Sequence, residues 1–141
     1  MKHKILIIED NTDFRNCIME FLQENGMDSL GGGSLKEAIS IYNGNSSEID
    51  LFLIDLKLPD GNGMNFLKDV RKESNTSPAI IMSGIITEDV RRIGRQLGVV
   101  EYFEKPFDIY ALERAVRKAI QYHSIYTVKE HLVPIQHLST I

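Results

Sequence analysis

The sequence predicts an α/β fold in which a five-stranded parallel sheet is flanked by five helices. Five short apolar runs alternate with five segments of helical periodicity, which is typical of parallel sheets with crossover helices. Two of the runs, residues 5–8 and 51–54, are continuously apolar, as expected for strands buried on both faces. Right-handed crossovers leave few arrangements, and the strand order 2-1-3-4-5 is one of the two common ones. We therefore expect a doubly wound sheet with that order.

The composition is that of one ordinary globular domain. The chain has 141 residues, of which 43% are hydrophobic and 26% charged, and its net charge of −4 argues against a general nucleic-acid binder. The single cysteine, Cys17, cannot form an internal disulfide and falls among apolar positions, so we expect it to fill the core. No stretch is long enough for a signal peptide or a membrane span, so we expect a cytoplasmic protein without membrane contacts.

The first quarter of the chain predicts two strands with a helix between them. Residues 5–8 form the first strand, and the following helix begins at Asn11 or Thr12, either of which can cap it. Its inward positions recur at helical spacing and are Phe14, Ile18, Phe21 and Leu22. Residues 27–30 form a weaker strand, which we expect at the edge of the sheet because it is less apolar. The glycines at 31–33 are expected to form a loop.

The middle of the chain predicts a helix, the central strand and a second helix. Ser34 begins the first of these helices, whose apolar positions are Leu35, Ala38, Ile39 and Tyr42. The central strand, residues 51–54, ends on Asp55 and leads into a turn rich in proline and glycine. The next helix runs from Gly63 to about Lys72.

The last part of the chain predicts two more strands and two more helices. Residues 79–82 and 99–103 form the strands, and a helix over about residues 87–97 lies between them. The final helix has the inward positions Leu112, Ala115, Val116, Ala119 and Ile120. We expect one domain over residues 1–122, with residues 123–141 as a C-terminal tail or the start of a linker.

Acidic side chains follow the first and third predicted strands. Glu9 and Asp10 come directly after residues 5–8, and Asp55 follows residues 51–54. In the expected order these strands are neighbours at the point where the winding reverses, which is where ligands bind in open α/β sheets. Three carboxylates that meet there repel one another unless they share protons or hold a cation. Their hard oxygen ligands, without a nearby His or Cys, favour Mg²⁺.

A hydroxyl and an ammonium group follow the fourth and fifth predicted strands, at the same edge. An aspartate beside Mg²⁺ and a cation is a suitable nucleophile for a phosphoryl group, whose oxygens need neutralising. Ser83 can donate to one such oxygen, and Lys105 can pair with another or, before phosphorylation, with Asp55. Taken singly, each residue could have a purely structural role: Ser83 could cap a turn, Lys105 could be solvated, and Asp10 could cap a helix. Their convergence from four strand ends favours the functional interpretation.

Over roughly residues 2–122 the sequence resembles the receiver domain of two-component response regulators, which has a flavodoxin-like fold. The residues that carry the resemblance, by identity and by spacing, are Glu9, Asp10, Asp55, Pro59, Gly63, Ser83, Lys105 and Pro106. The departures from the family pattern are mild. The acidic pair is Glu-Asp, which keeps both carboxylates, and the hydroxyl comes from Ser rather than the more frequent Thr.

The resemblance implies a phosphoacceptor signalling domain rather than an enzyme. Asp55 would accept a phosphoryl group from a sensor histidine kinase or a phosphotransfer protein. Mg²⁺ would be held by Asp10, Asp55 and the backbone carbonyl of Lys57, and Glu9 would contribute directly or through water. Family members influence the hydrolytic water through the side chains at the positions of Lys57 and Ile85. Neither side chain is suited to orient water, so we expect slow self-dephosphorylation.

The resemblance also implies how the signal leaves the domain. Ser83 and Lys105 would bind the phosphoryl oxygens, and the peptide bond between Lys105 and Pro106 would be cis. Tyr102 matches the aromatic switch position, whose ring turns inward when Ser83 moves toward the phosphate. The surface of the last two helices and the strand between them would then signal to a downstream protein or effector domain, or support a homodimer. Direct contact with nucleic acid is not implied.

Three other functions stay open at this point. A receiver-like module that acts independently of phosphate is disfavoured by the complete set of site residues. A magnesium-dependent aspartyl phosphatase of the haloacid-dehalogenase type normally needs a second Asp two positions after the nucleophile, where this chain has Lys57. An FMN binder with the same strand order would need a loop rich in Ser, Thr and Gly after the first strand, where Glu9, Asp10 and Asn11 stand.

Overall fold

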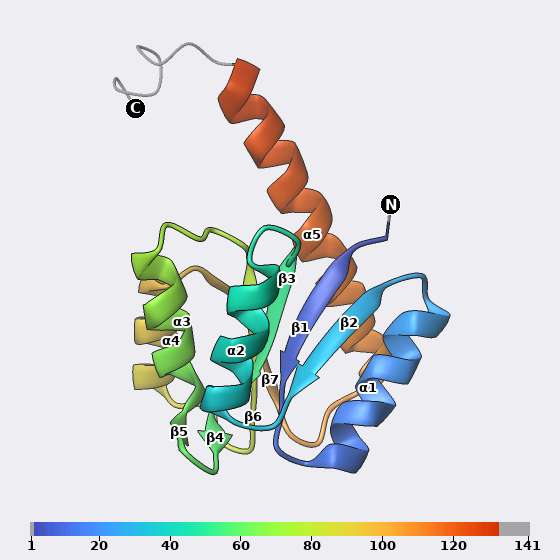
Figure 1. Ribbon diagram of the computed structural model, residues 1–141, viewed down its shortest axis with the longest axis vertical. Helices are drawn as coiled ribbons and strands as arrows, with labels where there is room; N and C mark the ends of the chain where they lie inside the picture. Colours follow the sequence, from blue (N-terminus) through green and yellow to red (C-terminus); the bar gives the residue numbers. More distant parts are fainter. Residues whose placement is uncertain (1, 133–141) are drawn as a thin grey trace.

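A computed structural model of the chain describes residues 2–132, with side chains described as far as residue 125. Within these residues, a five-stranded parallel sheet has the order β2-β1-β3-β6-β7 (Figure 1). The strands are β1 (Lys4–Ile8), β2 (Asp28–Gly32), β3 (Leu51–Asp55), β6 (Ala79–Ser83) and β7 (Val99–Glu104). In chain order this is 2-1-3-4-5, so the predicted doubly wound α/β fold is confirmed.

Five helices cover the two faces of the sheet. They are α1 (Thr12–Glu24), α2 (Leu35–Asn45), α3 (Gly63–Lys72), α4 (Glu88–Gln96) and α5 (Ile109–Leu132). Helices α2, α3 and α4 pack on one face, and α1 and α5 pack on the other (Figure 1). Because successive strand residues point to opposite faces, Leu6 and Ile8 join the first core and Ile5 and Ile7 the second.

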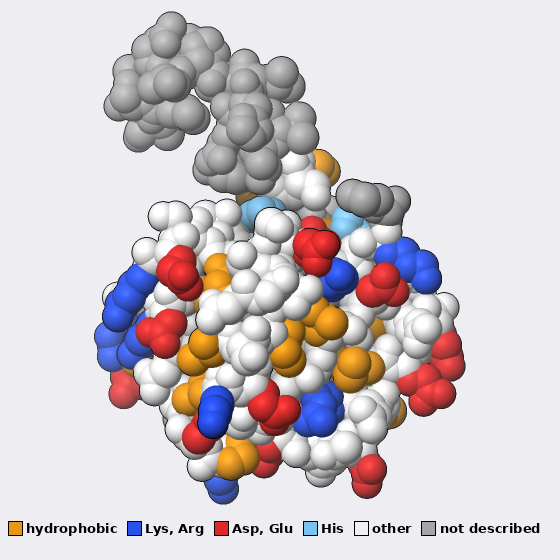
Figure 2. Space-filling model, viewed as in Figure 1, with side chains coloured by type: hydrophobic (Ala, Val, Ile, Leu, Met, Phe, Trp, Pro, Cys, Tyr) orange, Lys and Arg blue, Asp and Glu red, His pale blue; other side chains and the backbone are white. Residues whose placement is uncertain are grey.

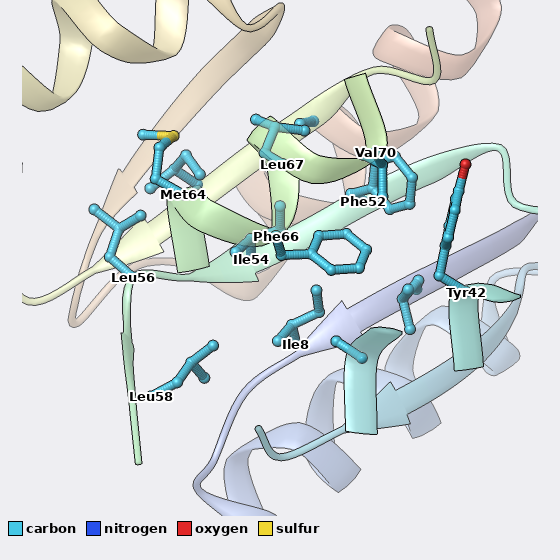
Figure 3. Packing of buried hydrophobic residues seen from close by; sticks show 14 of the residues in the cluster. Ile8, Tyr42, Phe52, Ile54, Leu56, Leu58, Met64, Phe66, Leu67 and Val70 are labelled. Atoms are coloured by element: carbon cyan, nitrogen blue, oxygen red, sulfur yellow. The ribbon is translucent and has the colours of Figure 1, made fainter. Parts of the chain in front are cut away.

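The core under α2 and α3 is built around three aromatic rings. Figure 3 shows Tyr42, Phe52 and Phe66 converging from α2, β3 and α3. The rings of Phe52 and Phe66 are 5.4 Å apart between centroids, and those of Tyr42 and Phe66 are 5.9 Å apart, both edge to face. This geometry is favoured by the quadrupoles of the rings, and the packing fixes α3 against the strand that carries Asp55.

Two expectations about helix faces are wrong. Cys17 is exposed rather than part of the core. One residue turns a helix by about 100°, so Cys17 lies far round from Ile18, which is fully buried against the sheet. Ile39 in α2 is 38% exposed, and Ile41 packs against the core in its place.

The second strand runs further than the sequence predicts. β2 lies at the sheet edge as expected, but it includes Gly31 and Gly32, where the sequence predicts a loop. A side chain at Gly31 would place a Cβ 2.9 Å from the Met19 sulfur and 3.0 Å from Cδ of Arg15. These glycines are therefore strand residues over which α1 and α2 pack closely. Because they carry no apolar side chain, the sequence pattern does not indicate a strand there.

A short hairpin follows the central strand. It consists of β4 (Lys57–Leu58) and β5 (Gly61–Asn62), which pair antiparallel, and it was not predicted. The turn residues Pro59 and Asp60 lie between its two strands. At its end Asn62 caps α3 by accepting a hydrogen bond from the amide of Met64 at 2.8 Å.

The last helix continues past the predicted end of the domain. α5 extends without interruption to Leu132, and its buried side chains as far as residue 125 are Leu112, Val116, Ala119 and Ile120. The part of the predicted tail from residue 133 on, including Pro134, lies outside the described residues, so the division at residue 122 stays a prediction.

The surface carries both signs of charge. On the face shown in Figure 2, acidic and basic side chains of the described residues are interspersed. None of the helices within residues 2–132 is long and apolar enough to cross a membrane, and the cytoplasmic location stays a prediction.

Candidate functional site

The carboxyl ends of four parallel strands bring the predicted site residues to one edge of the sheet. Glu9 and Asp10 follow β1, and Asp55 ends β3. The registers pair Ile8 with Ile54 in β1–β3 and Asp55 with Met82 in β3–β6. The acids therefore leave neighbouring strands at the same level, and β6 continues one residue further to Ser83.

The three predicted acids form one cluster. One carboxylate oxygen from each of Glu9, Asp10 and Asp55 lies within 4.8 Å of the others. Glu9 and Asp55 are buried, whereas Asp10 is exposed. Carboxylates this close repel one another, so the cluster needs a cation.

The cation within reach is Lys105, which follows β7. Its Nζ donates to Oε1 of Glu9 at 2.5 Å and to Oδ2 of Asp55 at 2.9 Å. Burial opposes the charged ammonium, but the two hydrogen bonds outweigh it and raise the pKa of Lys105. Burial also raises the pKa of Glu9, against the hydrogen bond from Lys105. Lys105 is thus held in its charged form, and its single positive charge is shared between Glu9 and Asp55.

Asp55 is fixed by the turn that follows it. Its Oδ1 accepts a hydrogen bond from the backbone amide of Lys57 at 3.2 Å. The amide of Gly63 donates to the carbonyl of Leu56 at 2.8 Å, which closes the base of the hairpin. A Cβ at Gly63 would lie 2.2 Å from the carbonyl oxygen of Asp55, so only glycine lets α3 start this close to the acid.

Glu9 is held by residues that the sequence did not indicate as part of the site. Its Oε2 accepts from the amide of Asn11 at 3.0 Å, and its backbone carbonyl accepts from Nη1 of Arg15 at 2.6 Å. The ring of Phe14 lies 5.1 Å from Nζ of Lys105, within the range of a cation–π interaction. All three contacts come from the first turns of α1, and a sequence pattern does not reveal them because they depend on how α1 sits on the sheet.

Ser83 and the segment after β7 are joined by the backbone. The amide of Lys105 donates to the carbonyl of Ser83 at 2.7 Å, and the peptide bond between Lys105 and Pro106 is cis. The Ser83 hydroxyl oxygen is weakly engaged, since it accepts only a 3.4 Å hydrogen bond from the amide of Ile85. Ile85 itself is 70% exposed.

Tyr102 lies in β7 and packs against α4. Its hydroxyl donates to the carbonyl of Arg91 at 3.2 Å, and the Arg91 guanidinium stands 5.0 Å above its ring. Burial raises the pKa of Tyr102, although Arg91 and Arg95 act in the opposite direction. A Cβ at Gly94 would lie 2.1 Å from the hydroxyl, so the ring occupies the space that this glycine leaves open. Gly94 is a further contact that the sequence did not indicate.

Two of the hollows on the surface of the described residues lie at opposite edges of the sheet. A hollow of about 400 Å³ adjoins the acid cluster and is lined by Asn11, Phe14, Lys105, Pro106 and Phe107. A larger one of about 660 Å³ is lined by the ends of α3 and α4, the start of β7 and part of α5. Because these elements meet at the amino-terminal edge of the sheet, only the smaller hollow belongs to the strand-end site.

Comparison with known proteins gives one consistent family. The sequence matches the response regulator receiver domain family over residues 5–117. It is 31% identical over 129 residues to the KDP operon transcriptional regulatory protein KdpE of Escherichia coli, covering 92% of this chain and 56% of that protein. It is 31% identical over 120 residues to the transcriptional regulatory protein CiaR of Streptococcus pneumoniae, covering 84% of this chain and 51% of that protein. The chain thus spans about half the length of the curated relatives it matches.

Solved structures agree with the sequence comparison. The non-phosphorylated HemR receiver domain of Leptospira biflexa superposes with a TM-score of 0.78 at 27% identity, covering 84% of this chain and 94% of that one. A response regulator receiver domain of Clostridium thermocellum gives 0.80 at 28% identity, covering 88% and 98%. A CheY-like receiver domain of Methanospirillum hungatei gives 0.82 at 20% identity, covering 89% and 99%, which shows the shared fold.

Proposed function

The chain belongs to the response regulator receiver domain family, and on this premise we propose that Asp55 is its phosphoacceptor. The observation that supports the assignment most directly is the setting of the Asp55 carboxylate. It lies at a strand end, within 2.9 Å of the Lys105 ammonium and beside two further acids. The donor in this proposal is the phosphohistidine of a sensor histidine kinase or of a phosphotransfer protein.

The proposed step transfers one phosphoryl group to the Asp55 carboxylate, which becomes an acyl phosphate. An oxygen of Asp55 attacks the phosphorus, so that a P–O bond forms and the P–N bond to the histidine breaks. The electron pair of the broken bond stays on the imidazole nitrogen, which takes a proton from water. Lys105 neutralises charge on the transferred oxygens, and the weakly engaged Ser83 hydroxyl is available to donate to another of them.

The acid cluster fits a magnesium ion. Its ligands are hard carboxylate oxygens within 4.8 Å of one another, the donor type that Mg²⁺ prefers. We propose that Asp10, Asp55 and the backbone carbonyl of Lys57 hold the ion, with Glu9 contributing directly or through water. When bound, the ion neutralises charge on the phosphoryl oxygens.

The proposed output surface is made of α4, β7 and α5. The Tyr102 ring rests on Gly94 and Arg91 of α4. In this proposal, a movement of Ser83 toward a bound phosphate would open space for the Tyr102 ring, which would then leave its place on α4. The named relatives are transcriptional regulators, and this chain matches only 56% and 51% of their lengths. We propose that this surface signals to an effector domain or a downstream protein, or forms a homodimer.

We propose a signalling domain rather than an enzyme that turns over a substrate. An aspartyl phosphatase would need an acid two residues after the nucleophile, and there the chain has the exposed Lys57. Neither Lys57 nor Ile85 offers a carboxylate or amide to orient water, so self-dephosphorylation is expected to be slow.

Incubation with acetyl phosphate and Mg²⁺, followed by intact-mass measurement, tests the proposal. The wild-type protein is expected to gain one phosphoryl group, and Asp55→Asn is expected to gain none. Removal of magnesium with EDTA should abolish the gain in the wild type. Equal labelling of both proteins, or no labelling of either, would defeat the assignment of Asp55, and a phosphoprotein lifetime of seconds would defeat the expectation of slow hydrolysis.

A further inference from the structure

Asp60, at the tip of the β4–β5 hairpin, binds the amino-terminal end of α2. Its Oδ1 accepts a hydrogen bond from the amide of Leu35 at 2.7 Å, and its Oδ2 accepts one from the amide of Lys36 at 3.0 Å. These amides belong to the first turn of α2, where backbone donors lack partners within the helix and the helix dipole favours an anion. The two bonds also lower the pKa of Asp60, which keeps the carboxylate charged.

Packing brings the hairpin and the helix together at the same place. A Cβ at Gly61 would lie only 2.8 Å from Cδ1 of Leu35, so the hairpin passes close to the first residue of α2. Leu58, on the other strand of the hairpin, is buried in the core cluster to which Leu35 is packed. The tip is therefore attached to α2 by two hydrogen bonds and an apolar contact.

The base of the same hairpin is attached to the phosphoacceptor. The amide of Lys57 donates to Oδ1 of Asp55, and Lys57 pairs with Asn62 across the hairpin. The hairpin is only six residues long and its two ends are tied to different elements. A shift at the tip is consequently passed to the backbone of Lys57, whose carbonyl is the proposed magnesium ligand.

We propose that Asp60 is a positioning residue for the metal site: by tying the hairpin to α2, it holds the Lys57 carbonyl in place for a divalent cation. The inference rests on the proposed function, because it takes the Lys57 carbonyl as a metal ligand. Since coupling between two sites is reciprocal, cation binding should in turn strengthen the contact between Asp60 and α2. The helix α2, which contributes no ligand, thereby becomes part of the support of the site.

The chain offers a matched control in Ser34. Its hydroxyl oxygen caps the same helix by accepting a hydrogen bond from the amide of Glu37 at 3.1 Å. Ser34→Ala and Asp60→Ala both remove a side-chain cap from α2, but only Asp60→Ala releases the hairpin. The magnesium dissociation constant of each variant is measured by calorimetry, with exchange of the Leu35 and Lys36 amides by NMR as a second measurement.

Asp60→Ala is expected to weaken magnesium binding by about tenfold, as for other residues that orient a metal ligand. Ser34→Ala should leave the dissociation constant unchanged, although α2 exchanges faster. Asp60→Asn, which keeps one acceptor oxygen, should lie between the wild type and Asp60→Ala. Magnesium should protect the Lys36 amide in the wild type and not in Asp60→Ala.

Equal dissociation constants for the wild type, Asp60→Ala and Ser34→Ala would overturn the proposal. Equal weakening by Asp60→Ala and Ser34→Ala would also overturn it, because stability of α2 would then explain the effect. A value for Asp60→Asn as weak as that of Asp60→Ala would mean that charge acts alone, without positioning. Failure of the wild type to bind magnesium would instead contradict the proposed function, so the two failures are distinguishable.

Discussion

At the scale of single residues, the site is a balance between buried acids and one ammonium group. Glu9 and Asp55 are almost completely buried, and Lys105 bonds to both. Removing one partner of such a network leaves uncompensated charge in a poorly solvated place. The same negative charge that makes this arrangement unstable without Lys105 also attracts a divalent cation. Under the proposed function, magnesium would offset charge on the same cluster as Lys105, and the two would meet at Asp55.

Lys105→Met is expected to lower the free energy of unfolding in EDTA by roughly 2 kcal/mol, a buried-pair effect reduced by the partial exposure of Lys105. Added Mg²⁺ should recover more stability in this variant than in the wild type, because the ion takes over the role of the ammonium. Urea unfolding with EDTA and with Mg²⁺ measures both effects. Lys118→Met, on the exposed side of α5, is the control and should behave as the wild type. If Mg²⁺ did not recover the stability lost in Lys105→Met, the ion would not replace the ammonium group.

The residues that carry charge at strand ends could be predicted from the sequence, whereas those that hold them could not. An acid after a buried apolar run cannot stay unpaired in the core, so its emergence at the sheet edge follows from local sequence. The hydrogen bond from Arg15 to Glu9 and the position of Phe14 over Lys105 depend on the angle at which α1 crosses the sheet. That angle is set by packing: α1 passes close over Gly31, where a Cβ would meet Met19 and Arg15, and the sequence does not reveal this approach.

At the scale of elements, α4 packs on β7 closely enough that a glycine of the helix lies against an aromatic ring of the strand. Gly94 is the buried residue of α4, and its missing side chain is replaced by the Tyr102 hydroxyl. In a helix, alanine is ordinarily more stable than glycine by up to about 1 kcal/mol. A loss of stability on adding a methyl group here would therefore report the contact with Tyr102 rather than helix propensity.

Gly94→Ala is expected to lower the free energy of unfolding by about 2 kcal/mol, as overpacking does in a filled space. In a Tyr102→Phe background the loss should shrink by about 1 kcal/mol, because the hydroxyl that clashes is gone. Gly44→Ala in α2, where a Cβ meets nothing within 4 Å, is the matched control and should stabilise the protein slightly. Urea denaturation of the double-mutant cycle measures the coupling, and additive losses would show that the hydroxyl is not the obstacle.

Elements with apolar periodicity could be predicted, and those defined by tertiary packing could not. The order of strands and helices follows from alternating patterns, and the structure confirms it. Gly31 and Gly32 carry no side chain that marks a strand, so β2 ends later than the sequence indicates. The β4–β5 hairpin is two residues long on each side, too short to produce a period, and it exists because its base and tip are tied to neighbouring elements.

At the scale of the whole molecule, the proposed functional edge and the protruding helix lie at opposite ends of the sheet. The site is at the carboxyl ends of the strands, whereas α5 runs beyond the amino-terminal edge (Figure 1). The last buried side chain of α5 among the described residues is Ile120, and Tyr122 and Ile125 are 70% and 57% exposed. Among the side chains described, up to residue 125, none beyond Ile120 is buried, and the boundary at residue 122 stays a prediction.

Truncation after residue 122 tests this boundary. Because the removed residues contribute no buried side chain among those described, the free energy of unfolding should stay within about 0.5 kcal/mol of the full chain. Phosphorylation by acetyl phosphate should be unchanged as well, since the site lies at the other edge of the sheet. Truncation after residue 118 is the comparison, because it also removes the buried Ala119 and Ile120. It should lower stability by at least about 3 kcal/mol through the lost core packing. If the longer fragment lost as much stability as the shorter one, α5 beyond residue 122 would be part of the domain core, and the boundary would be wrong.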